Sequence, residues 1–172
     1  MRRKFIIAVI IIACFLLQCT VFQALAIGSI TPNLMIVVTA AFGFMRGRKE
    51  GLFVGFFCGI LMDLFFGNVL GFYALVYMYI GFINGFFRTK FFPDRIKLPI
   101  FLIAASDMIY NLVIYFVMFL FRGRFAFGYY FLHTIVPGLV YTMIVSIFLY
   151  FILLKVNQNL EAYEKRRTAK FG

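Results

Sequence analysis

The stretch Gly55–Gly67, GFFCGILMDLFFG, decides the fold because it has the composition of a membrane-spanning helix and carries one acidic residue. Twelve of its thirteen residues are small or apolar, and the other is Asp63. Similar apolar runs recur along the chain, separated by short clusters of Lys and Arg. Of the 172 residues, 65% are hydrophobic, which is more than a soluble domain of this size can bury. The sequence therefore predicts an all-α polytopic integral membrane protein, without the period-two alternation of barrel strands.

We expect six transmembrane helices in one compact bundle, because the chain has six apolar runs with short connectors. These runs are residues 5–27, 31–45, 51–66, 69–87, 98–121 and 131–154. A continuous helix over the third and fourth runs would be about 55 Å long, nearly twice the hydrocarbon thickness, so a break is expected at Gly67-Asn68. The second and third runs are short and rich in small residues, which favours a place inside the bundle.

The two ends of the chain are expected to be cytoplasmic. Residues 24–26, ALA, resemble a signal-peptide cleavage site, but the 23-residue run before Gly28 is too long for a usual signal and predicts a span. With the N-terminus inside, the cytoplasmic segments hold 15 Lys and Arg residues, including the basic tail at residues 155–172, and the outer loops hold only Arg122 and Arg124. This positive-inside pattern predicts a multi-pass membrane protein with both termini inside.

The net charge of +11 does not indicate a nucleic-acid partner. The basic residues lie at the ends of apolar runs rather than on one face of a domain, which is the pattern of membrane topology. The basic tail is expected to contact anionic membrane lipids. The three cysteines lie inside apolar runs and are expected to be small packing residues.

Small residues in the third run recur every four positions. Gly51, Gly55, Gly59 and Gly67 share this spacing with Asp63, so all five are expected on one helix face. Such a stripe lets two helix backbones approach closely in lipid. We therefore expect the four glycines to form a helix-packing ridge, and Asp63 to face protein rather than lipid.

Three interpretations of Asp63 remain open from the sequence. The carboxylate reaches the outer interface and is hydrated, or it accepts hydrogen bonds that fix its helix in the bundle, or it belongs to a proton or ion site. The candidate donors at its depth are His133, Arg122 and Arg124. A structural role predicts that Asp63→Asn retains much function, whereas a proton-carrying role predicts that it does not.

Other polar residues also lie inside the apolar runs. They are Asn84, Asp107, Asn111 and His133. Asp107 lies near the expected midplane, so it is protonated, solvated by hydroxyl groups and Asn111, or placed in a cavity. Pro137 is expected to kink the last run, because its ring displaces the carbonyl of His133. No residue set has metal-ligand spacing, no cofactor is expected, and the motifs of common enzymes are absent.

Several of these residues together resemble the MreD family of bacterial rod-shape-determining membrane proteins. The matching residues are Pro32-Asn33-Leu34, Arg46-Gly47-Arg48, Glu50-Gly51, Gly55, Gly59, Asp63-Leu64, Gly67 and Leu70-Gly71. The resemblance implies a non-enzymatic scaffold of the elongation machinery, which builds lateral peptidoglycan. It also implies binding to an MreC-like single-span protein, and through it to RodA, a penicillin-binding transpeptidase and MreB.

A second class of membrane protein has similar features. The substrate-capturing subunits of energy-coupling-factor vitamin transporters are also small six-span proteins with basic inner loops. In that case Asp63, His133 and Tyr141 would line an outward cavity. Co-purification with an MreC-like protein or with a coupling ATPase module distinguishes the two classes.

Overall fold

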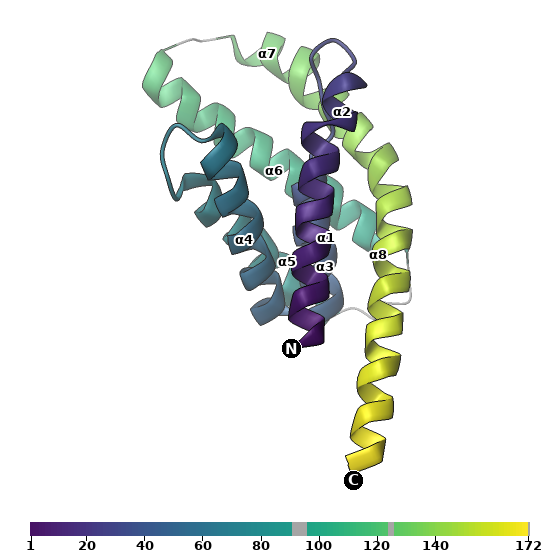
Figure 1. The fold of residues 1–172 in the computed structure, drawn as a ribbon. Helices are drawn as coiled ribbons and strands as arrows, with labels where there is room; N and C mark the ends of the chain where they lie inside the picture. Colours follow the sequence, from purple (N-terminus) through teal and green to yellow (C-terminus); the bar gives the residue numbers. More distant parts are fainter. Residues whose placement is uncertain (91–95, 124–125, 172) are drawn as a thin grey trace.

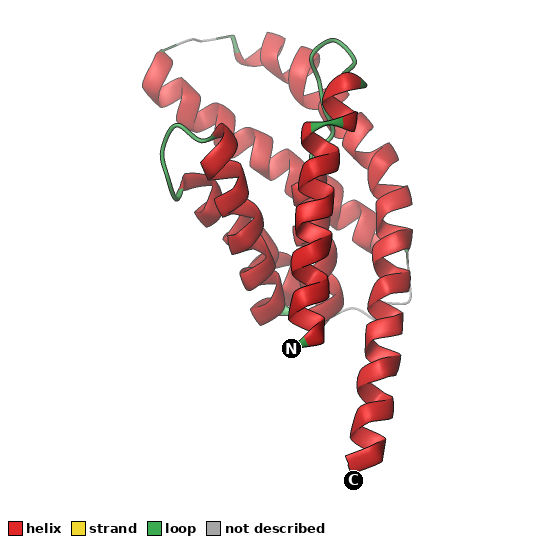
Figure 2. Ribbon diagram, viewed as in Figure 1, coloured by secondary structure: helices red, strands yellow, loops and turns green. Residues whose placement is uncertain are grey.

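The computed structural model describes residues 1–90, 96–123 and 126–171, and every regular element in them is a helix (Figures 1 and 2). The expected all-helical class is therefore confirmed. Arg95, counted among the cytoplasmic charges, and Arg124 lie outside the described residues. The helices are α1 (Arg2–Cys19), α2 (Val21–Ala24), α3 (Leu34–Arg46), α4 (Arg48–Phe66), α5 (Phe72–Arg88), α6 (Lys97–Arg122), α7 (Phe127–Tyr130), the π-helical turn η1 (Phe131–Ile135) and α8 (Val136–Phe171).

These helices coincide with the six apolar runs, which is compatible with the expected number of spans. The first run forms α1 and α2, the middle four form α3 to α6, and the last forms η1 and the start of α8. Among the described residues, three segments are long and apolar enough to cross a membrane: Arg2–Ala24, Lys97–Val117 and Phe127–Lys170. Of the others, α3 and α5 have 13 and 17 residues, and α4 has three charged residues in its first turn besides Asp63.

The centre of the bundle is α3. Every residue from Leu34 to Met45 is buried, because α1, α4, α5, α6 and α8 all contact this helix. A short helix was expected to be shielded in this way, and α3 is. The third run was also expected to be a short, shielded helix, but α4 has 19 residues and is shielded only in part, since Phe53, Phe57 and Phe65 are exposed.

Two glycines make the sharp turns between the short helices possible. Gly47 alone separates α3 from α4, and its φ of +102° lies in a region that side chains disfavour. Gly71, with φ +99°, precedes α5. Between them, α4 ends at Phe66 and Gly67 is its C-cap, so the break expected at Gly67-Asn68 lies where the structure ends the helix.

The last helix begins with an irregular turn and extends well beyond its apolar part. The turn η1 is π-helical and immediately precedes Val136-Pro137, where proline removes one backbone donor. From there α8 continues for 36 residues and includes most of the basic tail. In Figure 1 the N-terminus and the C-terminal part of α8 lie toward the same end of the molecule, opposite α2 and α7.

Candidate functional site

The closest helix contact in the molecule lies between α4 and α5, along the glycines of α4. A Cβ atom on Gly51 would overlap the carbonyl oxygen of Gly81, and one on Gly55 would overlap the carbonyl of Tyr77. A Cβ atom on Gly59 would overlap the backbone of Ala74. These three positions therefore tolerate no side chain while α5 stays in place.

The glycines of α5 and α3 complete this contact from the other side. A Cβ atom on Gly81 would overlap the carbonyl of Gly51, and one on Gly85 would overlap the backbone of Arg48. In α3, a Cβ atom on Gly43 would lie 2.6 Å from the Gly81 oxygen. Three helix backbones thus meet around Gly81. We call the contacts of Gly43, Gly51, Gly55, Gly59, Gly81 and Gly85 the glycine contact.

Gly67 does not share the glycine contact, although the sequence groups it with the other three. A Cβ atom there would lie 2.6 Å from the backbone oxygen of Asp63 in the same helix, not near another helix. Because α4 ends at Phe66, Gly67 lies past the last helical turn. Its role in the structure is to end the helix.

Asp63 binds the start of α5. Its carboxylate accepts hydrogen bonds from the backbone N–H groups of Gly71 at 3.0 Å, Tyr73 at 2.9 Å and Ala74 at 2.9 Å. The first N–H groups of a helix have no partner within the helix and carry a partial positive charge. Since Asp63 is only 4% exposed, it caps α5 from inside the bundle. This arrangement joins the end of α4 to the beginning of α5.

The side-chain donors expected for Asp63 are not the ones that the structure shows. His133 stacks on Tyr129 with ring centroids 4.2 Å apart and contacts the Tyr129 carbonyl at 3.1 Å. Arg122 ends α6 and is exposed, and Arg124 lies outside the described residues. The expected donors were side chains at the same depth as Asp63. The actual donors are backbone N–H groups at the start of the next helix, which the short turn places beside Asp63. The interpretation that Asp63 is hydrated at the outer interface is also wrong, because its side chain is buried.

A second polar cluster surrounds the buried start of α3. The Asn33 side chain caps a backbone N–H of α3 and accepts a hydrogen bond from the Tyr77 hydroxyl at 3.0 Å. The Asn33 N–H donates to the Thr142 hydroxyl at 3.2 Å. From α1, the Gln18 side chain accepts from the Met35 N–H at 3.2 Å. Side chains from α1, α5 and α8 thus contact the N-terminal turn of α3 or the residue that caps it.

Asp107 is attached to this cluster. It is 2% exposed, and the Thr142 hydroxyl interacts with its carboxyl group. Its Oδ2 atom has no hydrogen-bond partner within the described part of the chain. Asn111, expected to solvate the carboxyl group, instead donates to the backbone carbonyl of Asp107 at 2.8 Å. A hydroxyl group does therefore contact Asp107, but from α8 rather than from its own helix.

Asn84 links α5 to α6. Its side-chain nitrogen donates to the Ser106 hydroxyl at 2.7 Å and to the Ile80 carbonyl at 2.8 Å. The residue is buried, and it sits between the two glycines with which α5 joins the glycine contact. The sequence indicates Asn84 as an intramembrane polar residue, and its hydrogen bond to Ser106 places it between α5 and α6.

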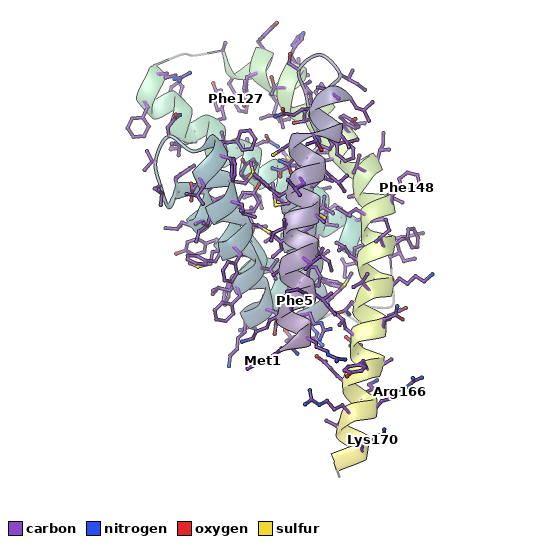
Figure 3. The ribbon with its side chains drawn as sticks, in the orientation of Figure 1. Met1, Phe5, Phe127, Phe148, Arg166 and Lys170 are labelled. Carbon is purple, nitrogen blue, oxygen red and sulfur yellow. The ribbon has the colours of Figure 1, made fainter. Side chains whose placement is uncertain are left out.

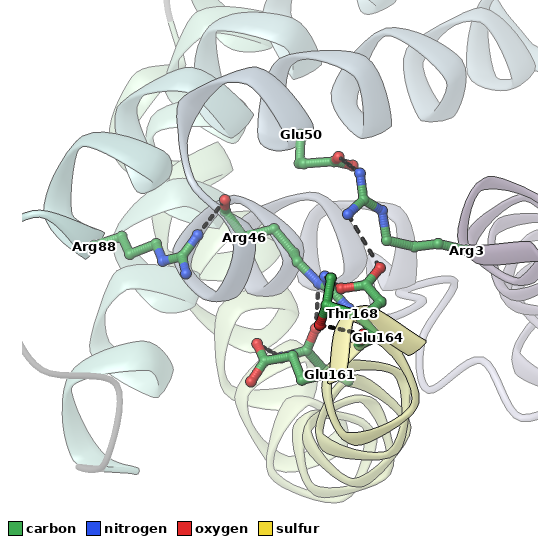
Figure 4. A network of polar contacts seen from close by, with 8 residues as sticks. Arg3, Arg46, Glu50, Arg88, Glu161, Glu164 and Thr168 are labelled. Atoms are coloured by element: carbon green, nitrogen blue, oxygen red, sulfur yellow. Dashed lines mark hydrogen bonds and ion pairs between the residues drawn. The ribbon is translucent and has the colours of Figure 1, made fainter. Parts of the chain in front are cut away.

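A cluster of ion pairs joins the basic end of the bundle (Figure 4). Arg3 of α1 pairs with Glu50 of α4 at 2.6 Å and with Glu164 of α8 at 3.2 Å. Arg46 of α3 also pairs with Glu164, at 3.3 Å, and its carbonyl accepts a hydrogen bond from Arg88 of α5. Sequence reasoning treated the tail only as a basic segment. The available signal was that Asn157, Glu161 and Glu164 recur at helical spacing within it.

The comparison with protein families decides the identity. The family model for the rod shape-determining protein MreD matches residues 1–160. The chain belongs to the MreD family. Neither the curated proteins nor the solved structures include a match.

The MreD match covers the glycine contact and Asp63, and it ends before Glu164. MreD is a structural family of membrane proteins that determine cell shape, and it is not known as an enzyme. As a member of this family, the chain has a role in determining rod shape. The match does not favour the vitamin-transporter alternative. Among residues 1–90, 96–123 and 126–171, no three His, Cys, Asp or Glu side chains are grouped as a metal site would require.

Proposed function

We propose that this chain is a non-enzymatic membrane scaffold of the cell-elongation machinery, and that it binds an MreC-like single-span protein. The observation that carries the proposal is the MreD match over residues 1–160. Through the MreC-like protein, the scaffold would meet RodA, a penicillin-binding transpeptidase and MreB. Its role is to organise lateral peptidoglycan synthesis.

Close packing inside the bundle supports a scaffold role, because it keeps α3, α4 and α5 at fixed distances from one another. The glycine contact holds the backbones of α3, α4 and α5 against one another, and Asp63 fixes the turn between α4 and α5. Contacts of this kind leave little freedom for helices to slide. A partner that binds this bundle therefore meets a surface of constant shape.

The outer surface supports binding within the bilayer. Large apolar side chains cover the exposed faces of the long helices, including Phe148 of α8, which is 70% exposed (Figure 3). The outer face of α4 adds Phe53, Phe57 and Phe65. A single membrane helix of a partner can pack on such a surface in place of lipid, provided that van der Waals contact is close.

We further propose that the chain is a multi-pass protein of the bacterial plasma membrane with both termini in the cytoplasm. The 15-to-2 distribution of Lys and Arg supports this orientation. The ion-pair cluster supports it too, since basic segments distant in sequence gather at one end of the bundle. Single cysteines at Arg48 and Lys170 should be protected from impermeant thiol reagents in intact cells. Labelling of either position from outside would contradict this topology.

The partner is tested by affinity purification of the tagged chain in mild detergent. We expect an MreC-like protein to co-purify, and depletion of the chain to turn rod-shaped cells round. Recovery of a coupling ATPase module without an MreC-like protein would overturn the scaffold and support the transporter. As a specificity control, Gly128→Ala should change neither result, because a Cβ atom at Gly128 meets nothing within 4 Å.

A further inference from the structure

A groove lies between the first turn of α1 and the C-terminal part of α8, at the basic end of the molecule. It encloses about 390 Å³. Arg2, Arg3 and Ile6 line it on one side, and Val156, Leu160 and Arg167 line it on the other. The residues that line the groove include neither Asp63 nor any glycine of the glycine contact, so the groove is a separate feature.

The charges around the groove are unbalanced in favour of an anion. Arg2, Arg3 and Arg167 line the groove together with one carboxylate, that of Glu164, and Glu50 outside the lining also pairs with Arg3. Glu164 is already shared between Arg3 and Arg46. Arg167 is exposed and has no ion pair within the described residues. A positive charge therefore remains available at the rim of the groove.

Two of these guanidinium groups are held in place before any ligand arrives. Arg2 donates to the Tyr163 hydroxyl at 3.0 Å and lies 5.8 Å from the centre of the Tyr163 ring. Arg3 is fixed by Glu50 and Glu164, and its Nε atom is buried without a hydrogen-bond partner in the described structure. Arginine groups held in this way bind phosphate oxygens well, since their donors are already oriented.

The other part of the groove is apolar. Ile6, Val156 and Leu160 line it, and they lie where the apolar run of α1 begins and that of α8 has just ended. The groove therefore crosses the boundary between hydrocarbon and headgroups. A phospholipid has the matching composition, with a phosphate beside its glycerol and the first acyl carbons. An acidic peptide would match the arginines but not apolar residues at this depth.

We propose that this groove binds the headgroup of an anionic phospholipid, with its phosphate between Arg2 and Arg167 and its acyl carbons beside Ile6 and Val156. Such a lipid fills the space between α1 and α8 and contacts both helices. The site is independent of any protein partner, so it stands or falls separately from the proposed scaffold function.

Native mass spectrometry of the full chain in detergent tests this proposal. The probes are phosphatidylglycerol and phosphatidylcholine with the same acyl chains. We expect one phosphatidylglycerol to be retained about 25-fold better than phosphatidylcholine, since each of the two arginines near an anionic lipid contributes about fivefold to binding. The Arg2→Ala/Arg167→Ala variant should lose this preference. The control Lys165→Ala/Arg166→Ala removes the same charge from exposed positions outside the groove and should keep the preference.

A second variant fills the groove without changing its charge. Val156→Trp should weaken phosphatidylglycerol retention while circular dichroism shows an unchanged helical content, so this variant decides the matter if the double arginine variant fails to fold. Equal retention of the two lipids by the original chain would overturn the proposal. So would an equal loss in both double variants, or displacement of phosphatidylglycerol by a poly-glutamate peptide, which would assign the groove to a protein partner.

Discussion

The two ends of this bundle are held together by different kinds of contact. At the α4–α5 turn, a carboxylate that is 4% exposed binds backbone groups 8 to 11 residues away. At the basic end, Glu164 has a side chain that is 40% exposed and reaches Arg3 and Arg46, which are 161 and 118 residues away. Buried local contacts hold a fixed geometry, whereas an ion pair with one partly exposed partner is weakened by salt and hydration. The bundle therefore has a rigid α3–α4–α5 unit, and the C-terminal part of α8 is joined to it by contacts that depend on salt.

The glycine contact provides the strongest test of the rigid unit. Gly55→Leu and Gly59→Leu should each destabilise the protein by about 3 kcal/mol or more, because the new side chain must separate two backbones. Thermal unfolding in detergent and rescue of rod shape measure the effect. Gly128→Leu introduces the same side chain where the structure has open space and should behave like the original chain. Normal melting of both α4 variants would show that the two helices do not need this spacing.

Asp63 provides the next largest effect. Asp63→Leu leaves the backbone N–H groups of Gly71, Tyr73 and Ala74 without this acceptor, and it should lower the free energy of unfolding by about 2 kcal/mol. Partner recovery and rod shape should be lost with it. Asp63→Asn keeps one acceptor oxygen and should retain much of the function. Both variants are compared at equal expression for melting, cell shape and recovery of the MreC-like protein. Equal inactivity of the two would argue for a proton-carrying role and against the capping role.

Glu164 should give the smallest effect, and one that depends on salt. Glu164→Ala removes the ion pairs to Arg3 and Arg46 and should cost about 1 kcal/mol at low salt. The difference from the original chain should shrink in 1 M NaCl, where the screening length is only about 3 Å. Glu161→Ala removes an equal charge from the same helix and a hydrogen bond from Asn157, but it leaves both ion pairs of Glu164 intact, so the difference between the two variants measures those pairs. A salt-independent loss in the Glu164 variant would mean that α8 is held as rigidly as α5.

The sequence predicted those features that depend on spacing within one helix. Glycines at intervals of four in the third run indicated a close contact, and in the structure Gly51, Gly55 and Gly59 all face α5. Gly67 has the same spacing, but the helix ends before it, and helix ends are not determined by spacing alone. The approximate positions of the helices could likewise be predicted, because each apolar run is long enough to form one helical segment.

The partners of Asp63 and Glu164 could not be predicted in this way. Asp63 binds backbone groups, which every residue except proline carries, so no residue type in the sequence points to them. Glu164 is paired because α8 continues as a helix past its apolar part, which places this carboxylate beside Arg3 of α1 and Arg46 of α3. Such contacts depend on the direction of helices in space, and a charge count along the chain contains no information about that direction.

The π-helical turn at Phe131–Ile135 sets the rotation of α7 relative to α8. A π turn amounts to one residue inserted into an α-helix, and each residue of an α-helix corresponds to a rotation of about 100°. The side chains of α7 are therefore turned by about one residue's rotation relative to the buried face of α8, which Thr142, Ser146, Tyr150 and Asn157 form. Because α8 is held by that face and by the ion pairs of Glu164, deleting Thr134 would leave α8 in place and rotate the short segment Phe127–Tyr130 instead. One extra residue thus decides which side chains of α7 meet the rest of the bundle and which meet its surroundings.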